Sequence, residues 1–398
     1  MASASSTTSN LSRESHPITP VVSVVMPTYN GERFLRPAIE SILSQCCRNF
    51  ELLVVDDGST DRTPSILREF AARDDRVIVL TNLRNLGIAT ATNRGLAAAR
   101  GEYVALQDHD DISLPHRFQT QLDFLRSHPD VAAVGSAATL IDENGDAYAE
   151  FPLPCEEIDI KWRLLFWGDA FHYTSIMVKR SALLEIGGYD EDPAFRFSEA
   201  YDPFSRLAMQ YHVTNVPESL VLWRRHVDAT SLQRQQEQMR SGDIISARNI
   251  SLLGDLGPAS DGNLQRCIRG LRAFTSTPAG RLPTLPAKQV VCGLVFLCKL
   301  QKRFYRVHGF SRSAVARHRR MLNWFWGKHA IALSLRAPWK LRDRLSLFAW
   351  GVRCLGDWAW YALLSGASSG SSMHPKFTVP TITFFAPPSE HSTWSEGH

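Results

Sequence analysis

The sequence has few cysteines and no long uninterrupted apolar run, and each absence excludes a class of protein. Seven cysteines among 398 residues, an odd number without regular spacing, do not indicate a disulfide framework and are typical of a reducing cytosol. Residues 1–19 are rich in Ser and Thr and lack an apolar core, so we expect neither a signal peptide nor a membrane anchor there. A net charge of +4 is too small to indicate nucleic-acid binding.

Membrane-spanning helices are not expected either. Residues 290–300 are apolar but supply only about half of the ~20 residues that a spanning helix needs. Residues 345–364 are long enough, but Arg353 and Asp357 lie in the middle of this segment. These two charges cost about 5–7 kcal/mol, whereas the Leu, Val and Phe residues of the segment return only about 2–4 kcal/mol. We therefore expect an interfacial or buried helix.

What the sequence does contain is an alternation of apolar strands and amphipathic helices. Runs of β-branched and other apolar residues predict buried strands, and apolar residues at helical spacing predict helices. The predicted strands are residues 21–26, 51–55, 77–80, 103–106, 131–136 and 176–178, and the predicted helices run to about residue 45 and over residues 63–73 and 88–100. This alternation favours an α/β fold with a mostly parallel sheet, on which ligands bind beyond the carboxyl ends of the strands.

Acidic residues follow two of the predicted strands. Asp57 follows residues 51–55, and Asp108 and Asp110 follow residues 103–106. Because Asp108 and Asp110 are spaced i, i+2, both carboxylates can point out of one turn toward one hard cation such as Mg²⁺ or Mn²⁺. A solvated acidic turn before the next helix is the alternative interpretation.

Four sets of residues occur in an order and at spacings that resemble the family 2 inverting glycosyltransferases, which have the GT-A fold. They are Pro27–Asn30, Val54–Asp61, Asn85–Gly87 with Asn93–Gly95, and Asp108–Asp111. The resemblance covers about residues 20–230. It implies a Rossmann-like, mostly parallel sheet flanked by helices, a nucleotide-diphosphate-sugar donor and a Mn²⁺ or Mg²⁺ ion. It also implies an acceptor hydroxyl that attacks the anomeric carbon in one inverting displacement.

The resemblance implies roles for residues at the donor end of the site. Thr28 and Tyr29 would line the binding site of the nucleotide base, with Tyr29 stacking on the base. Asp57 would accept a hydrogen bond from the base imide. Asp108 would hold the ribose or a metal-bound water, and Asp110 would ligate the metal ion that bridges the two phosphates.

Trp223–His226 resembles the Tyr-Arg-x-His segment with which the family closes over the diphosphate. Arg224 and His226 are the expected phosphate contacts, because a guanidinium group pairs well with phosphate oxygens. A solvated basic patch is the alternative interpretation.

The acceptor end of the site departs from the family pattern. The family uses an Asp as the general base, and the matching position here is Ala200, which cannot accept a proton. We predict that Glu199 serves as the base, with Asp202 as the alternative. Two other classes of function stay open. One is a catalytically silent nucleotide-sugar-binding protein, and the other is a metal-dependent nucleotidyltransferase, although Pro27–Asn30 is not the Gly-rich basic loop that such enzymes carry.

The family resemblance does not reach the C-terminal part of the chain. Residues 299–344 contain 13 Lys and Arg and one acid, with Trp and Phe interleaved, a pattern that fits anionic lipid headgroups. A solvated helical bundle packed on the catalytic domain is the alternative. The predicted organisation is a disordered lead (1–19), a GT-A catalytic domain (20–235), a mainly helical basic extension (236–364) and a disordered tail (365–398).

These observations together predict a cytoplasmic glycosyltransferase, peripheral on the inner face of the cell membrane. Its acceptor would be a glycan or a lipid-linked glycan in surface polysaccharide or lipopolysaccharide synthesis. Nucleic acid is not an expected partner, because the chain offers no recognition module.

Overall fold

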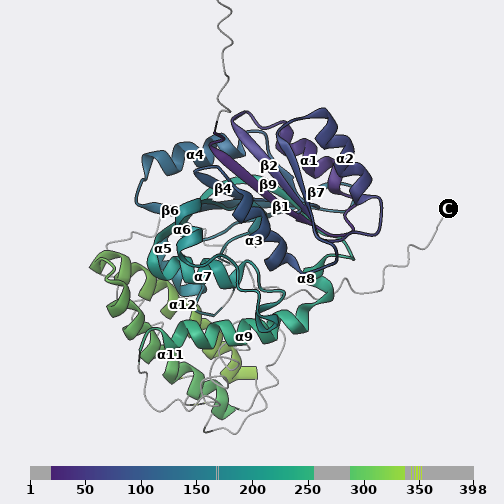
Figure 1. Cartoon of the computed structure of the whole chain (residues 1–398). Coiled ribbons are helices and arrows are strands. Elements are labelled where there is room, and N and C mark those ends of the chain that lie inside the picture. Colours follow the sequence, from purple (N-terminus) through teal and green to yellow (C-terminus); the bar gives the residue numbers. More distant parts are fainter. Residues whose placement is uncertain are drawn as a thin grey trace, which may run out of the picture.

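The computed structural model describes residues 19–254 except 167 and 169, residues 287–336, and residues 342, 345, 347, 349 and 351. Within these residues the chain forms a nine-stranded sheet in the order β3-β2-β1-β4-β8-β6-β9-β5, with β7 paired to β6 (Figure 1). The strands are β1 (Val22–Thr28), β2 (Phe50–Asp56), β3 (Val77–Thr81), β4 (Tyr103–Leu106), β5 (Ile112–Ser113), β6 (Val131–Ile141), β7 (Ala147–Phe151), β8 (Met177–Lys179) and β9 (His212–Arg224).

Helices flank this sheet and continue beyond it toward the C-terminus. They are α1 (Leu35–Leu43), α2 (Thr63–Arg73), α3 (Ile88–Ala98), α4 (Arg117–Ser127), α5 (Glu157–Arg163), α6 (Arg180–Glu185), α7 (Tyr201–Gln210), α8 (Thr230–Gln233), α9 (Gln235–Ser251), α11 (Ala287–His308) and α12 (Arg312–Arg336), with the short 3₁₀ helices η1 (Tyr173–Ser175) and η2 (Pro193–Phe195).

The first four strands in the order β3-β2-β1-β4 are all parallel. Every residue of β1 and β2 is buried, as expected for parallel strands covered on both faces. Neighbouring residues point to opposite faces, so Val24 packs in the core beneath α1 and α2, whereas Val25 packs in the core beneath α3. The carboxyl ends of these strands therefore meet at one edge.

The rest of the sheet is mixed and brings distant segments to that edge. β8 pairs antiparallel with both β4 and β6, while β9 runs parallel to β6 and antiparallel to β5. As a result, the end of β9 at Arg224 lies beside the turn that follows β4. The structure confirms the predicted α/β fold with a mostly parallel sheet flanked by helices.

The C-terminal helices pack against the part of the chain that contains the sheet through α5. Trp162 on α5 and Phe166 just after it share a buried apolar cluster with Leu300 and Phe304 on α11 and Trp326 on α12. The rings of Trp162 and Phe304 have centroids 5.1 Å apart. In Figure 1, α9, α11 and α12 lie together on the side of the molecule opposite α1 and α2.

Across the described residues, no helix combines the length and the apolar content that crossing a bilayer requires. The helix expected over residues 345–364 lies largely outside the described residues. The expected disordered lead, up to residue 18, and the expected tail over residues 365–398 also lie outside them.

Candidate active site

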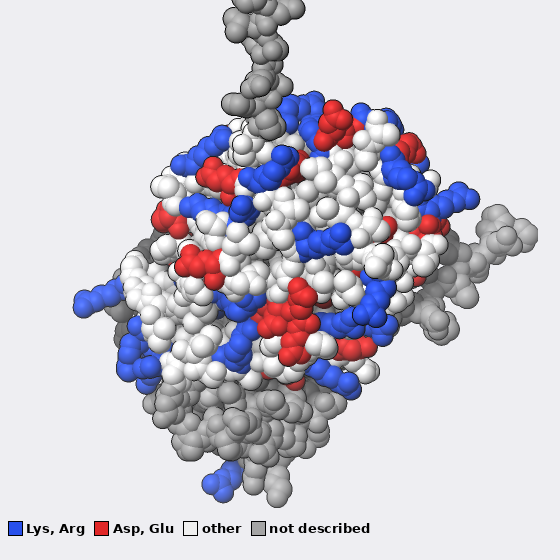
Figure 2. All heavy atoms as spheres, viewed as in Figure 1, with Lys and Arg blue, Asp and Glu red and all other residues white. Residues whose placement is uncertain are grey.

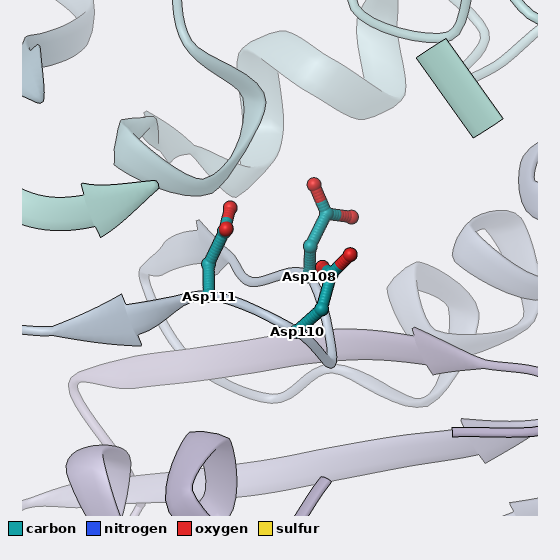
Figure 3. A group of neighbouring side chains, drawn as sticks. All are labelled: Asp108, Asp110 and Asp111. Carbon is teal, nitrogen blue, oxygen red and sulfur yellow. The ribbon is translucent and has the colours of Figure 1, made fainter. Parts of the chain in front are cut away.

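The turn between β4 and β5 carries three carboxylates that point to the same side (Figure 3). They belong to Asp108, Asp110 and Asp111, and one possible ligand oxygen from each lies within 4.8 Å of the others. Asp108 and Asp110 are the predicted metal ligands. Asp111 received no role in the sequence analysis, although its place in the same acidic run was a signal. Three oxygen ligands on one turn fit a hard divalent cation.

The three carboxyl groups repel one another in the absence of a cation. Burial, followed by the charge of Asp110, raises the pKa of Asp108 to about 8, and the charge of Glu199 adds to this rise. Burial and the charges of Asp110 and Asp108 raise the pKa of Asp111 well above its ordinary value. A divalent cation would offset this repulsion, so the electrostatics of the turn also fit a metal site.

His226 lies beside Asp110. Its Nε2 atom is 2.9 Å from Oδ2 of Asp110, and its ring packs 4.8 Å from the ring of Phe34. Burial acts to raise the pKa of Asp110, but the hydrogen bond from His226 and the nearby histidine charges outweigh it and lower that pKa. The predicted phosphate contact is thus placed to orient the Asp110 carboxylate.

Thr174 in η1 holds the other two carboxylates. Its Oγ1 atom lies 2.6 Å from Oδ2 of Asp111 and 3.3 Å from Oδ2 of Asp108, and it accepts a hydrogen bond from the Asp108 backbone N–H. Sequence reasoning missed this residue, and its only signal was its place in a polar segment just before β8.

Arg224, the other predicted phosphate contact, is buried and ties the acidic turn to the β6–β7 hairpin. Its Nε donates to the carbonyl of Asp110, and its Nη1 donates to the carbonyls of Asp142 and Glu143. Its backbone N–H donates to Oδ1 of Asp111 at 2.9 Å. These bonds fix the turn from the side of β9.

Asp57 lies just beyond β2 and organises the loop before α3. Its carboxylate accepts hydrogen bonds from Asn82 Nδ2 at 2.7 Å, from the Leu86 backbone N–H at 3.0 Å and from the Gly87 backbone N–H at 2.7 Å. The predicted hydrogen bond from a nucleotide base to Asp57 would compete with these donors.

Thr28 and Tyr29 lie at the same edge, at the end of β1. Thr28 is buried, and within the described residues its Oγ1 atom has no hydrogen-bond partner. Tyr29 is 42% exposed, so its ring is accessible to a ligand. The predicted stacking of a nucleotide base on Tyr29 stays a prediction.

Glu199 precedes α7. Its charge contributes to the raised pKa values of Asp108 and Tyr173, which indicates that its carboxyl group lies near the acidic turn. Burial raises the pKa of its own carboxyl group, although that group accepts a hydrogen bond from the Phe197 backbone N–H at 3.0 Å. Phe197 has a φ of 65°, a left-handed conformation that is uncommon for an aromatic residue. The loop that carries Glu199 is therefore sharply bent.

Asp202, the alternative base, lies in the first turn of α7 and is paired through both oxygens. Oδ2 is 2.6 Å from Nη2 of Arg206, and Oδ1 is 2.5 Å from Nη1 of Arg248 on α9. Both oxygens of Asp202 are thus engaged by guanidinium groups. Ala200 forms the N-cap of the same helix.

Comparison with known proteins assigns the family. Residues 23–187 match the sequence model described as Glycosyl transferase family 2. The protein named "Putative glycosyltransferase EpsE" of Bacillus subtilis is 36% identical over 212 residues, which cover 53% of this chain and 75% of EpsE. The chain belongs to glycosyl transferase family 2. This membership sets aside the nucleotidyltransferase alternative.

Another relative and a solved structure are also similar to this chain. The uncharacterized glycosyltransferase MJ1057 of Methanocaldococcus jannaschii is 35% identical over 209 residues, covering 52% of this chain and 71% of MJ1057. The crystal structure of Staphylococcus aureus TarS 1–349 aligns with a TM-score of 0.48 and 15% identity, over 87% of this chain and 91% of that chain.

Proposed function

We propose that this glycosyltransferase uses a nucleotide-diphosphate-sugar and transfers its sugar to an acceptor hydroxyl with inversion of the anomeric carbon. The observation that carries the proposal is the group of three carboxylates at the carboxyl edge of the parallel strands, with the Glu199 carboxyl nearby. The carboxylates would hold a cation against the diphosphate, and Glu199 would take the proton of the acceptor. One displacement of this kind needs no covalent intermediate on the protein.

The proposed cation is Mn²⁺ or Mg²⁺, held by Asp108, Asp110 and Asp111. When bound, such a cation neutralises the charge that develops on the departing diphosphate. His226 and Thr174 hold these carboxylates in place through the hydrogen bonds described above. Because the ligand set is already assembled, little rearrangement would accompany binding of the donor.

The donor base is proposed to lie against Thr28 and the accessible ring of Tyr29, beside the loop that Asp57 holds. Aromatic rings bind bases by stacking, and Asp57 fixes the backbone of residues 86 and 87 at the same edge. Any contact of Arg224 with the diphosphate would add to the bonds it already makes to backbone carbonyls.

Glu199 is the proposed general base, in preference to Asp202. Its pKa is raised by burial, which brings a carboxyl group closer to the pH at which a base works best. Asp202 is instead occupied by Arg206 and Arg248. The longer side chain of Glu199 would replace the carboxylate that the family places at the position of Ala200.

We further propose that the acceptor is a glycan or lipid-linked glycan and that the enzyme works on the inner face of the cell membrane. Lys299, Lys302 and Arg306 are exposed on α11 at the i, i+3, i+7 spacing of one helix face. Residues 287–336 hold eleven Lys and Arg and no Asp or Glu. Anionic lipid headgroups would attract such a surface.

The charge on the visible part of the catalytic surface does not suggest nucleic acid. On the face shown in Figure 2, basic and acidic side chains are interspersed over the described residues. Nucleic-acid-binding proteins instead gather Lys and Arg on one face.

A donor panel tests the proposed function. Purified protein is incubated with Mn²⁺ and a set of UDP-, GDP- and TDP-linked sugars, and release of the nucleoside diphosphate is measured. We expect turnover with one donor class that disappears on chelation of the metal and in Asp110→Ala. Release that is unaffected by chelation would refute the metal-assisted mechanism, and no release from any donor would favour a silent binding protein.

A further inference from the structure

Arg117, the first residue of α4, is a fully buried arginine behind the acidic turn. All five N–H groups of its guanidinium donate to uncharged oxygens. Nε donates to Gln121 Oε1, Nη1 to Gln107 Oε1 and Ser113 Oγ, and Nη2 to the carbonyls of Leu106 and Ile176. Burying a charge without a close ionised partner is costly, so a purely structural site would more simply hold an uncharged side chain.

The bonds of Arg117 determine how the Gln107 amide is oriented. Gln107 Oε1 accepts from Arg117 Nη1 at 3.1 Å and from Ser113 Oγ at 2.7 Å. Its Nε2 therefore faces the other way and donates to the carbonyls of Asp108 and Asp111, both at 3.0 Å. The side-chain amide of Gln107 thus connects the backbone at the two ends of the acidic turn.

The same guanidinium also anchors the segment that holds the carboxylates from the opposite side. Nη2 bonds to Leu106 at the end of β4 and to Ile176, which directly follows η1. Thr174 of η1 provides the hydroxyl that holds Asp108 and Asp111. Arg117 thus connects the backbone of the turn with the segment that orients its side chains.

The charge of Arg117 also acts on the site. Burial lowers the pKa of Arg117 to about 9, which leaves the guanidinium charged at neutral pH. The negative charge of Asp111 favours the charged form of Arg117 and so acts to raise the pKa of Arg117. A positive charge behind three carboxylates reduces their mutual repulsion before a cation arrives. Arginine supplies both the charge and the planar fork of five donors, whereas lysine supplies only the charge.

We propose that Arg117 is a positioning residue for the divalent cation. It holds the Asp108–Asp111 turn in its metal-binding shape through Gln107 and supplies a positive countercharge. This inference rests on the metal-assisted function proposed above. Groups that orient metal ligands typically contribute about 10–100-fold to metal affinity.

Titration with Mn²⁺ alone tests the proposal, with the free ion followed by electron paramagnetic resonance. Arg117→Met and Gln107→Leu are each expected to weaken Mn²⁺ binding about tenfold or more, and Arg117→Lys to have an intermediate effect. If both act through one network, the double variant should lose less than the product of the single losses.

Gln45→Leu is the matched control. Gln45 is a fully buried amide that also anchors α4, because its Oε1 accepts from the Phe118 backbone N–H and its Nε2 donates to the Leu114 carbonyl. These partners lie outside the acidic turn. We expect a comparable loss of thermal stability in this variant, with Mn²⁺ affinity within about twofold of the wild type.

Three results would overturn the positioning role. The first is wild-type Mn²⁺ affinity in folded Arg117→Met, or in Gln107→Leu if the arginine variant does not fold. The second is an equal loss of affinity in Gln45→Leu, which would mean a general effect of stability. The third is no Mn²⁺ binding by the wild-type protein, which would remove the metal-assisted function as well, whereas the first two leave that function intact.

Discussion

The Nε2 atom of His226 lies 2.9 Å from the Oδ2 atom of Asp110, although the two residues are 116 positions apart. β9 makes this contact possible because it runs beside both β6 and β5 and ends next to the acidic turn. The carboxylate proposed as a central ligand of the metal ion is thus oriented by a residue that lies far away in the sequence.

Asp110→Ala should abolish metal-dependent donor turnover without unfolding the protein. The carboxylate carries little core packing, and its removal relieves repulsion on Asp108 and Asp111. His226→Ala should lower turnover about 10–100-fold, because Asp110 loses the group that orients it. Thermal unfolding and nucleotide release measure both effects, with the exposed acid Asp75→Ala as the control. Near-normal turnover in Asp110→Ala would exclude its role as a ligand.

Glu199→Gln should lower the rate of transfer about 10²–10⁴-fold while donor binding persists. Only the ionised carboxylate accepts a proton, so the rate should rise as pH rises through the pKa of Glu199. Burial raises that pKa, so this acidic limb should lie above the ordinary range of a glutamate. A pH–rate profile measures it, and the residual activity of Glu199→Gln should lack the limb. Adding Ala200→Asp to this variant should restore part of the rate.

Asp202→Asn should mainly affect stability. Removing one partner from its ion pairs with Arg206 and Arg248 should cost about 3 kcal/mol, seen as a lower midpoint in denaturant. The acidic limb of the pH–rate profile should stay in place. If Asp202→Asn removes that limb while Glu199→Gln retains it, the base is Asp202.

The basic face of α11 should bind anionic vesicles. Lys302→Ala with Arg306→Ala removes two exposed charges, worth about 1 kcal/mol each at an anionic surface, so partitioning should fall about 30-fold. Arg62→Ala with Arg68→Ala, on and beside α2, is the matched control and should have little effect. Sedimentation with phosphatidylserine vesicles measures this, and binding should weaken as salt rises. Equal binding to neutral vesicles would contradict the proposal.

The sequence was most informative where local pattern and burial agree. The largely apolar runs that form β1 and β2 are buried along their whole length, and the helix predicted over residues 63–73 has those bounds. β6 extends to Ile141, beyond the predicted end at residue 136. Pairing with β7 and β9 stabilises the additional residues as strand, although their intrinsic strand propensity does not predict it.

The candidate site was predictable only in part. The acidic turn could be placed because it directly follows a strand, but its supports come from residues far away in the sequence. The turn is supported by Thr174 from η1, by His226 from beyond β9 and by Arg117 from α4. Such contacts between distant segments cannot be predicted from a local sequence pattern. The pairing of Asp202 with Arg248 likewise depends on α9, a helix that lies beyond the region matched by the family model.

The anomeric configuration of the released sugar tests the central claim most directly and needs no knowledge of the acceptor. The protein is incubated with Mn²⁺ and the donor found by the panel, with water as the acceptor, and proton NMR spectra are recorded before the free sugar mutarotates. A single displacement predicts that the first sugar to appear has the anomeric configuration opposite to that of the donor. Release of a sugar with the donor's own configuration would contradict the inverting mechanism.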